Sequence, residues 1–231
     1  MKKALKFIIS WLIIFIFTGA KPKARLIDMP KLNYTMLSLG DSYTIGESVL
    51  PQENFPNQTV KLLNKVGYEF DSPEIIAKTG WTTDELQTAI NVHKFLLKYD
   101  FVTLLIGVNN QYRGRPVENY KSEFENLLMQ AIQFAGNDTT HVIVLSIPDW
   151  GSTPFAEGRD RKQITIEIDE YNAVNKMIAD KFKVHYINIT PGTREAANDN
   201  SLLAADGLHP SAKEYQRWAD QVSAFIKNQL Q

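Results

Sequence analysis

The chain has 231 residues, a length typical of one folded domain. Hydrophobic residues make up 44 % of it and charged residues 22 %, values that exclude a disordered or collagen-like chain. The formal net charge of −1 gives no electrostatic signal for binding nucleic acid. The chain has no cysteine, which excludes disulfides, zinc–thiolate sites, iron–sulfur clusters and cysteine nucleophiles.

The first twenty residues have the pattern of a secretory signal peptide. Three lysines precede an unbroken apolar run over residues 7–17, and small residues follow it, ending at Ala20. We therefore expect a signal peptide over residues 1–20, cleaved after Ala20, and a protein that is periplasmic or secreted. The apolar run is shorter than the roughly 20 residues that span a bilayer. An uncleaved anchor is the alternative, and it is the only membrane contact we expect.

Beyond a lead segment over residues 21–33, short apolar runs alternate with amphipathic stretches to the C-terminus. The apolar runs predict strands over residues 34–39, 74–77, 101–106, 142–145 and 184–189. The amphipathic stretches predict helices over residues 57–66, 82–97, 118–135, 164–182 and 211–231, with a polar loop over residues 149–163. Strands that alternate with helices imply right-handed crossovers. We therefore expect residues 34–231 to form one flavodoxin-like domain, a three-layer α/β/α sandwich with a five-stranded parallel sheet.

Polar residues follow three of the predicted strands, at the sheet edge where ligands bind in folds of this kind. The three segments are Gly40-Asp41-Ser42-Tyr43, Thr79-Gly80-Trp81 and Gly107-Val108-Asn109-Asn110. Each of them, taken separately, is an ordinary turn sequence. Together they would bring a hydroxyl, a glycine amide and an asparagine amide to one crevice, and these groups serve as nucleophile and oxyanion donors in acyl transfer.

A further segment supplies a base with its orienting acid. Asp206 and His209 are three residues apart on a turn before the last predicted helix. In that arrangement the carboxylate accepts a hydrogen bond from one imidazole nitrogen and leaves the other free to act as base toward a serine. The remaining histidines lie in a predicted helix or at strand starts, away from this edge. We therefore predict Ser42 as nucleophile, His209 as base and Asp206 as its partner.

In combination, Gly40-Asp41-Ser42, Gly80, Gly107-Val108-Asn109 and Asp206-x-x-His209 resemble the four blocks of the GDSL, or SGNH, esterase/lipase family. The resemblance extends from about Tyr34 to the C-terminus. It implies an α/β/α sandwich and a serine esterase, acyl esterase or lysophospholipase that needs neither cofactor nor metal. It also implies an oxyanion hole formed by the backbone N–H groups of Ser42 and Gly80 and the Asn109 side chain.

Two positions depart from the family pattern. Tyr43 stands where the family name has leucine, and Asn110 stands where the family usually has aspartate. The second departure bears on the residues that support the oxyanion asparagine. Thr44 lies two residues after Ser42, so the Gly-x-Ser-x-Gly elbow of the α/β-hydrolases is absent.

We expect the substrate to be a small-molecule ester, either a lipid or an acylated sugar. The residues that we expect to contact it are Asp41, Trp81, Asn110, Tyr112, Arg113 and Trp150. Basic residues of the same loops, at positions 113, 115, 159, 161 and 162, would favour a lysophospholipid or another anionic ester. If those residues are only solvated, an exported carbohydrate O-acetyl esterase is the better interpretation.

Three functions of other kinds stay open at this point. The first is a flavodoxin-like domain that binds a flavin or nucleotide beside the first strand. The second is a carbohydrate-binding relative without catalytic activity. The third is a metal-dependent hydrolase that uses Asp41, Asp206 and His209 as ligands.

Overall fold

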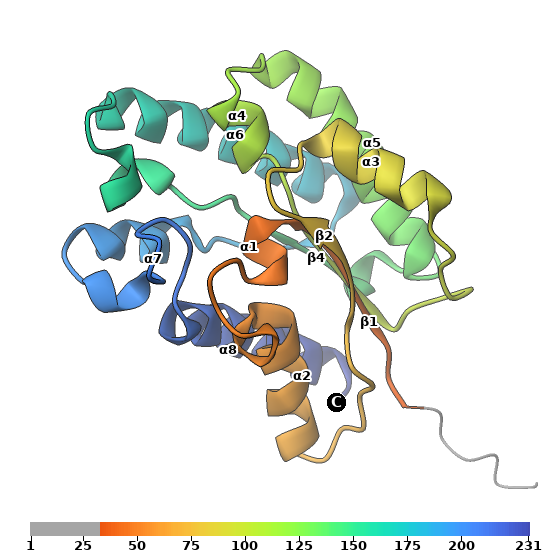
Figure 1. Cartoon of the computed structure of the whole chain (residues 1–231). Coiled ribbons are helices and arrows are strands. Elements are labelled where there is room, and N and C mark those ends of the chain that lie inside the picture. The colour runs from red at the N-terminus through yellow and green to blue at the C-terminus, as the bar shows by residue number, and fades with distance from the viewer. Residues whose placement is uncertain (1–32) are drawn as a thin grey trace, which may run out of the picture. The chain divides into compact units, whose positions relative to one another are not determined.

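The computed structural model describes residues 33–231, and a five-stranded parallel sheet lies at its centre (Figure 1). The predicted signal peptide and residues 21–32 of the lead segment lie outside the described residues. Within the described part, none of the helices combines the length and the apolar character that crossing a membrane requires.

The strands are β1 (Met36–Asp41), β2 (Glu74–Lys78), β3 (Phe101–Leu105), β4 (Val142–Leu145) and β5 (His185–Ile187). Their order in the sheet is β2-β1-β3-β4-β5, and every neighbouring pair is parallel. All residues of β1, β3 and β4 are buried, as expected for strands covered on both faces. From β1 the chain adds β2 on one side and then β3 on the other side. The position between β1 and β3 is therefore a topological switch point, where a crevice forms at the carboxyl ends of the strands.

Helices cover both faces of the sheet, so the predicted three-layer α/β/α sandwich is confirmed (Figure 1). On one face, α2 (Phe55–Lys65) packs against α8 (Ala212–Gln229). On the other face lie α3 (Thr83–Val92), α5 (Val117–Phe134) and α6 (Arg161–Phe182). Three short helices, α1 (Ser42–Ile45), α4 (Val108–Tyr112) and α7 (Thr190–Arg194), follow β1, β3 and β5 at the carboxyl edge.

The predicted helix over residues 82–97 is too long, because α3 ends at Val92. His93 takes an extended conformation, and its Nε2 lies 2.5 Å from a carboxylate oxygen of Glu74. Phe95 then packs on Phe134, with ring centroids 4.3 Å apart, whereas Leu97 is fully exposed. Leu97 therefore has a helical spacing in the sequence, but its side chain does not pack on the core. Phe95 provides the apolar contact after the helix has ended.

Other boundaries move because side chains cap the helices. The helix predicted over residues 57–66 begins at Phe55, since the Asn54 side chain accepts a hydrogen bond from the Asn57 N–H. The loop predicted over residues 149–163 contains two turns of 3₁₀ helix, and its last residues already belong to α6, which Asp160 caps. Helix α4 occupies the segment where a turn was expected.

Phe55→Ala tests the packing between α2 and α8. Phe55 is fully buried, and its ring lies 6.1 Å from that of Trp218. The substitution is expected to lower the free energy of unfolding by about 3–5 kcal/mol, measured by urea denaturation. Leu97→Ala is the control, and its effect is expected to stay within about 0.5 kcal/mol because Leu97 packs against nothing. Equal effects of the two substitutions would contradict this description of the core.

Candidate active site

The tight turn at the end of β1 places Ser42 at the carboxyl edge of the sheet. Ser42 is the first residue of α1, and the Asp41 carboxylate caps this helix by accepting a hydrogen bond from the Tyr43 N–H (3.0 Å). A Cβ at Gly40 would lie 2.1 Å from Thr44 Oγ1 and 2.5 Å from the Leu105 carbonyl oxygen. Only glycine therefore allows β1 to turn into α1 this close to β3.

The side chains of Ser42, His209 and Asp206 form one hydrogen-bonded series. His209 Nε2 lies 3.0 Å from Ser42 Oγ, and His209 Nδ1 lies 2.6 Å from Asp206 Oδ2. Ser42 and His209 are buried, whereas Asp206 is partly exposed. This arrangement holds Nδ1 as the donor toward the carboxylate and leaves Nε2 to accept the proton of the Ser42 hydroxyl.

Asp206 is held by more than the imidazole. Its Oδ2 also accepts a hydrogen bond from Ser48 Oγ (2.7 Å), and its Oδ1 accepts from the backbone N–H groups of Leu208 and His209 (3.0 Å each). Partial burial raises the pKa of Asp206, but the hydrogen bonds from His209, Ser48 and the backbone lower that pKa to about 2. The carboxylate is therefore ionised at neutral pH and stabilises a positive charge on His209.

The oxyanion donors predicted at Gly80 and Asn109 lie beside Ser42, on the same cavity. Gly80 has a φ of +83°, and its carbonyl accepts a hydrogen bond from Arg113 Nη2 (2.6 Å). Asn109 Nδ2 donates to the Trp81 carbonyl (3.1 Å) and lies 3.4 Å from Asp41 Oδ2. These contacts fix the orientations of the Gly80 peptide and the Asn109 amide.

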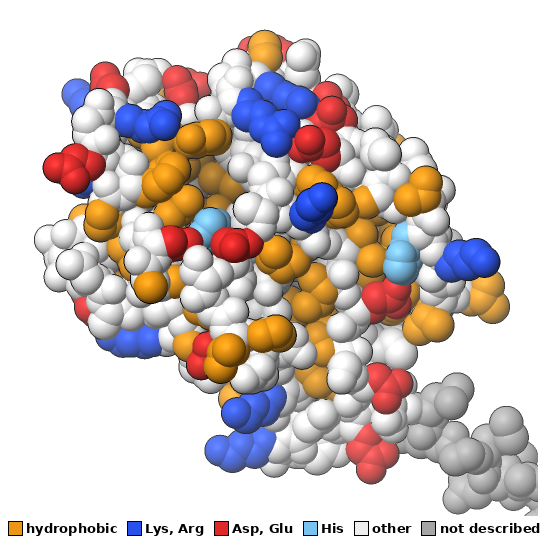
Figure 2. All heavy atoms as spheres, viewed as in Figure 1, with side chains coloured by type: hydrophobic (Ala, Val, Ile, Leu, Met, Phe, Trp, Pro, Cys, Tyr) orange, Lys and Arg blue, Asp and Glu red, His pale blue; other side chains and the backbone are white. Residues whose placement is uncertain are grey.

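A cavity of about 170 Å³ opens in front of Ser42 and His209. Part of its wall is a cluster of three aromatic rings, those of Tyr112, Trp150 and Phe155, with centroids 5.3–6.2 Å apart. The space-filling view shows hydrophobic side chains gathered around a hollow in which a histidine is visible (Figure 2). Hydrophobic walls with a few polar groups at one end are typical of small-molecule sites.

The structure brings six predicted site residues to the cavity, and Asp206 lies behind His209. The six are Ser42, Gly80, Asn109, Tyr112, Trp150 and His209. It does not bring the other four expected substrate contacts, Asp41, Trp81, Asn110 and Arg113, to the cavity lining.

These four residues support the cavity instead. Asp41 is buried under α1, and Trp81 and Arg113 hold the oxyanion donors through the contacts given above. Asn110 is also fully buried: its amide oxygen accepts from the Thr83 N–H (3.1 Å) and its amide nitrogen donates to Thr83 Oγ1 (2.6 Å). The side chains of Asp41 and Asn110 therefore point into the protein, whereas Trp81 acts through its backbone carbonyl and Arg113 stays largely exposed.

Further residues of the site were not predicted as site residues from the sequence. Tyr43, Thr79, Val108 and Leu208 line the cavity, and each is next to a predicted site residue in the sequence. Ser48 bonds to Asp206 across 158 positions of the chain, so no local pattern could have indicated it.

The basic residues expected to attract an anionic substrate are mostly engaged with other groups. Arg113 pairs with Glu85 (3.2 Å) and Arg115 with Asp84 (2.5 Å), and the hydrogen bond from Arg115 lowers the pKa of Asp84 to about 2. The guanidinium of Arg159 lies over the rings of Tyr112 and Trp150, at 5.2 and 5.4 Å. Across residues 33–231, no three histidine or acidic side chains are grouped so as to hold a metal ion.

A family model and several solved structures are similar to this chain. The model of the GDSL-like lipase/acylhydrolase family matches residues 38–217. No curated protein matches the sequence. A lipase/acylhydrolase from Enterococcus faecalis has a similar structure, with a TM-score of 0.66 and 21 % identity, over 85 % of this chain and 96 % of that one.

Two further similar structures are esterases. The esterase EstA from Pseudoalteromonas sp. has a TM-score of 0.62 and 18 % identity, over 86 % of this chain and 99 % of that one. The acetylxylan esterase Axe2 from Geobacillus stearothermophilus has a TM-score of 0.62 and 18 % identity, over 84 % of this chain and 94 % of that one. At this level of identity the three likenesses show a shared fold.

Asp41 is expected to make the stability of the protein depend on pH. Burial raises the pKa of Asp41 from 3.8 to about 7, against the lowering effect of its hydrogen bonds from Tyr43 and Asn109. Between these two values the folded state binds the proton more strongly than the unfolded chain does. The free energy of unfolding should therefore fall as the pH rises through this interval, by at most about 1.4 kcal/mol per pH unit.

Urea denaturation of the wild type and of Asp41→Asn at pH 5, 6, 7 and 8 measures this dependence. We expect the wild type to lose more stability between pH 5 and pH 7 than the variant. Asp206 acts with the opposite sign, but it loses its contribution only as the pH falls below 3.8 toward its folded pKa of about 2, outside this range. Identical pH profiles for the two proteins would show that Asp41 is not protonated in the folded state.

Proposed function

The chain belongs to the GDSL-like lipase/acylhydrolase family, and we propose that it is a serine hydrolase that cleaves carboxylic esters through an acyl-enzyme on Ser42. The observation that supports this most directly is the hydrogen-bonded series Ser42–His209–Asp206 beside a cavity of substrate size. A nucleophile, a base and an orienting acid in this order are the geometric requirement for acyl transfer to serine.

In the first half of the reaction, Ser42 Oγ attacks the ester carbonyl carbon while its proton passes to His209 Nε2, 3.0 Å away. The ionised Asp206 stabilises the imidazolium that results. The carbonyl oxygen becomes negative, and we assign its stabilisation to the N–H groups of Ser42 and Gly80 and the amide of Asn109. The C–O bond then breaks, and the alcohol leaves with the proton held by His209.

In the second half, water takes the place of the alcohol. His209 Nε2 removes a proton from this water, whose oxygen attacks the acyl carbon on Ser42. The bond between that carbon and Ser42 Oγ breaks, His209 returns the proton to Ser42, and the carboxylic acid is released. Each proton moves through the same nitrogen, so the single base serves both steps.

The ion pairs of two nearby arginines favour a neutral substrate over a lysophospholipid. Arg113 and Arg115, which would attract a phosphate, already pair with Glu85 and Asp84. The rings of Tyr112 and Phe155 are each 42 % exposed at the cavity. Exposed rings of this kind suit the apolar face of a sugar, so hydrolysis of O-acetyl groups on an extracellular carbohydrate is our second candidate function.

Ser42→Ala tests the proposed nucleophile. We expect hydrolysis of p-nitrophenyl acetate to fall by about 10⁴-fold or more and labelling by a fluorophosphonate probe to disappear. Ser122→Ala is the matched control, because Ser122 lies exposed on α5 and bonds only to the Asn119 carbonyl there. A Ser42→Ala protein with nearly wild-type activity would refute the proposal. A yellow protein that no probe labels would favour the flavin-binding alternative.

Asn109→Ala tests the oxyanion donor. Loss of one such donor costs about 2.7–4 kcal/mol of transition-state stabilisation, so kcat is expected to fall roughly 10²- to 10³-fold. KM should change little, since the missing hydrogen bond forms mainly in the transition state. Asn119→Ala, an exposed asparagine of the neighbouring helix, is the control. An unchanged kcat in the Asn109→Ala protein would remove Asn109 from the mechanism.

A further inference from the structure

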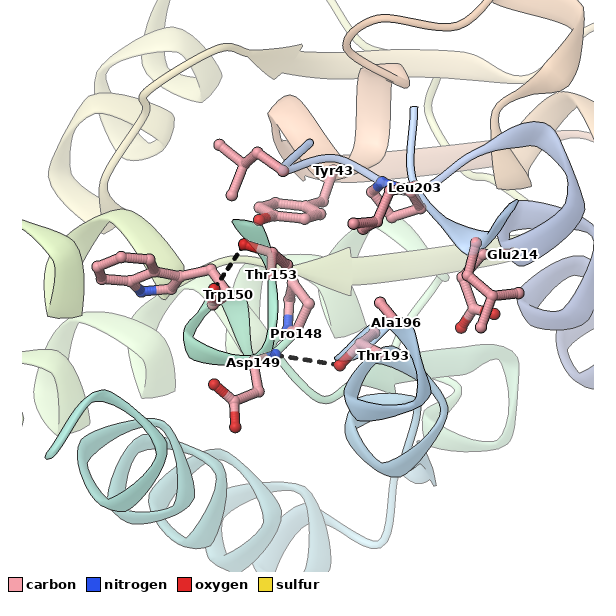
Figure 3. A pocket seen from close by; sticks show the side chains of 12 residues that line it. Tyr43, Pro148, Asp149, Trp150, Thr153, Thr193, Ala196, Leu203 and Glu214 are labelled. Carbon is pink, nitrogen blue, oxygen red and sulfur yellow. Dashed lines mark hydrogen bonds between the residues drawn. The ribbon is translucent and has the colours of Figure 1, made fainter. Parts of the chain in front are cut away.

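A second and much smaller cavity, drawn in Figure 3, shares part of its lining with the first. Its volume is about 10 Å³, close to the minimum that holds one water molecule. Three side chains line both cavities and so form the partition between them: Tyr43, Trp150 and Leu208. We call the smaller cavity the rear chamber.

Of these three residues, Tyr43 can be substituted without the loss of a side-chain hydrogen bond. Trp150 is held by a hydrogen bond from its Nε1 to Gln111 (2.7 Å), and Leu208 donates its N–H to Asp206 (3.0 Å). The Tyr43 side chain makes no hydrogen bond with any residue of the described chain. Its ring is 4 % exposed and packs on the His209 ring, with centroids 4.9 Å apart.

The Tyr43 ring closes the larger cavity on the side of the rear chamber. Figure 3 shows the ring lying across the rear chamber, with its hydroxyl end toward Trp150 and Thr153. Beyond it the chamber is walled mainly by apolar groups, among them Pro148, Ala196 and Leu202. Such walls suit a hydrocarbon chain, but the chamber is too small for one while the ring is in place.

We infer that Tyr43 sets the length of acyl group that the enzyme accepts, and that it restricts the substrate to esters of short acyl groups such as acetyl. This inference rests on the proposed function. Each methylene removed from water contributes roughly fourfold to affinity. A long acyl chain gains less of this affinity here, because the ring keeps it from extending into the rear chamber.

The test compares p-nitrophenyl acetate, butyrate and octanoate, which share one leaving group. For the wild type, kcat/KM is expected to be at least about tenfold lower for octanoate than for acetate. Tyr43→Val removes the ring and joins the two cavities, so the octanoate-to-acetate ratio of kcat/KM should rise on the order of tenfold. Tyr43→Leu should change the ratio in the same direction, and it serves if the valine variant fails to fold.

Two controls separate the ring from other effects of Tyr43. Tyr43→Phe keeps the ring and loses only the hydroxyl, so the wild-type ratio is expected to persist. Ala196→Met, added to Tyr43→Val, refills the rear chamber from its far wall and should return the ratio toward the wild-type value. A wild type that prefers octanoate, or a labelled Tyr43→Val enzyme with the wild-type ratio, overturns the inference.

The two proposals fail in different ways. If the wild type is neither labelled by a fluorophosphonate nor active on any of the three esters, the proposed function fails, and the inference falls with it. If the wild type is labelled and active but its chain-length preference does not respond to Tyr43→Val or Tyr43→Leu, the serine mechanism stands and only the role of Tyr43 is rejected.

Discussion

The close approach of β1 to β3 at Gly40 is the contact on which the site depends. Gly40 pairs with Leu105 in the sheet, and no Cβ fits between it and the Leu105 carbonyl. The chain turns into α1 immediately after this contact, which places Ser42 at the sheet edge. Asn109 follows Leu105 by four residues and arrives at the same place. A larger distance between β1 and β3 at Gly40 would by itself separate Ser42 from Asn109.

The remaining parts of the site are joined by contacts to backbone carbonyls of the segment between β2 and α3. Arg113 holds the Gly80 carbonyl, and Asn109 holds that of Trp81. Asn110 adds two hydrogen bonds to Thr83 at the start of α3. Helix α4 and the chain after β2 are therefore tied into one unit, and this unit sets the distance between the Gly80 peptide and the Asn109 amide.

The sequence predicted the sheet well because buried parallel strands leave continuous apolar runs, as at residues 101–106. It also grouped Ser42 with Asp206 and His209, although these two lie in the turn before α8 and not at a strand end, because their residue types and spacing suit a base and its orienting acid. It could not show which way Asp41 and Asn110 point, because that depends on the backbone turn at each position. Leu97 had helical spacing but no partner, and Ser48 meets Asp206 through a contact that only the complete fold creates.

The hydrogen bonds around Asp206 occupy the whole of its carboxylate group. Each carboxylate oxygen accepts two hydrogen bonds, one pair from the Leu208 and His209 amides and the other from Ser48 and the imidazole. Four donors match the acceptor capacity of a carboxylate. A calcium or magnesium ion could therefore bind Asp206 only by displacing one of these donors.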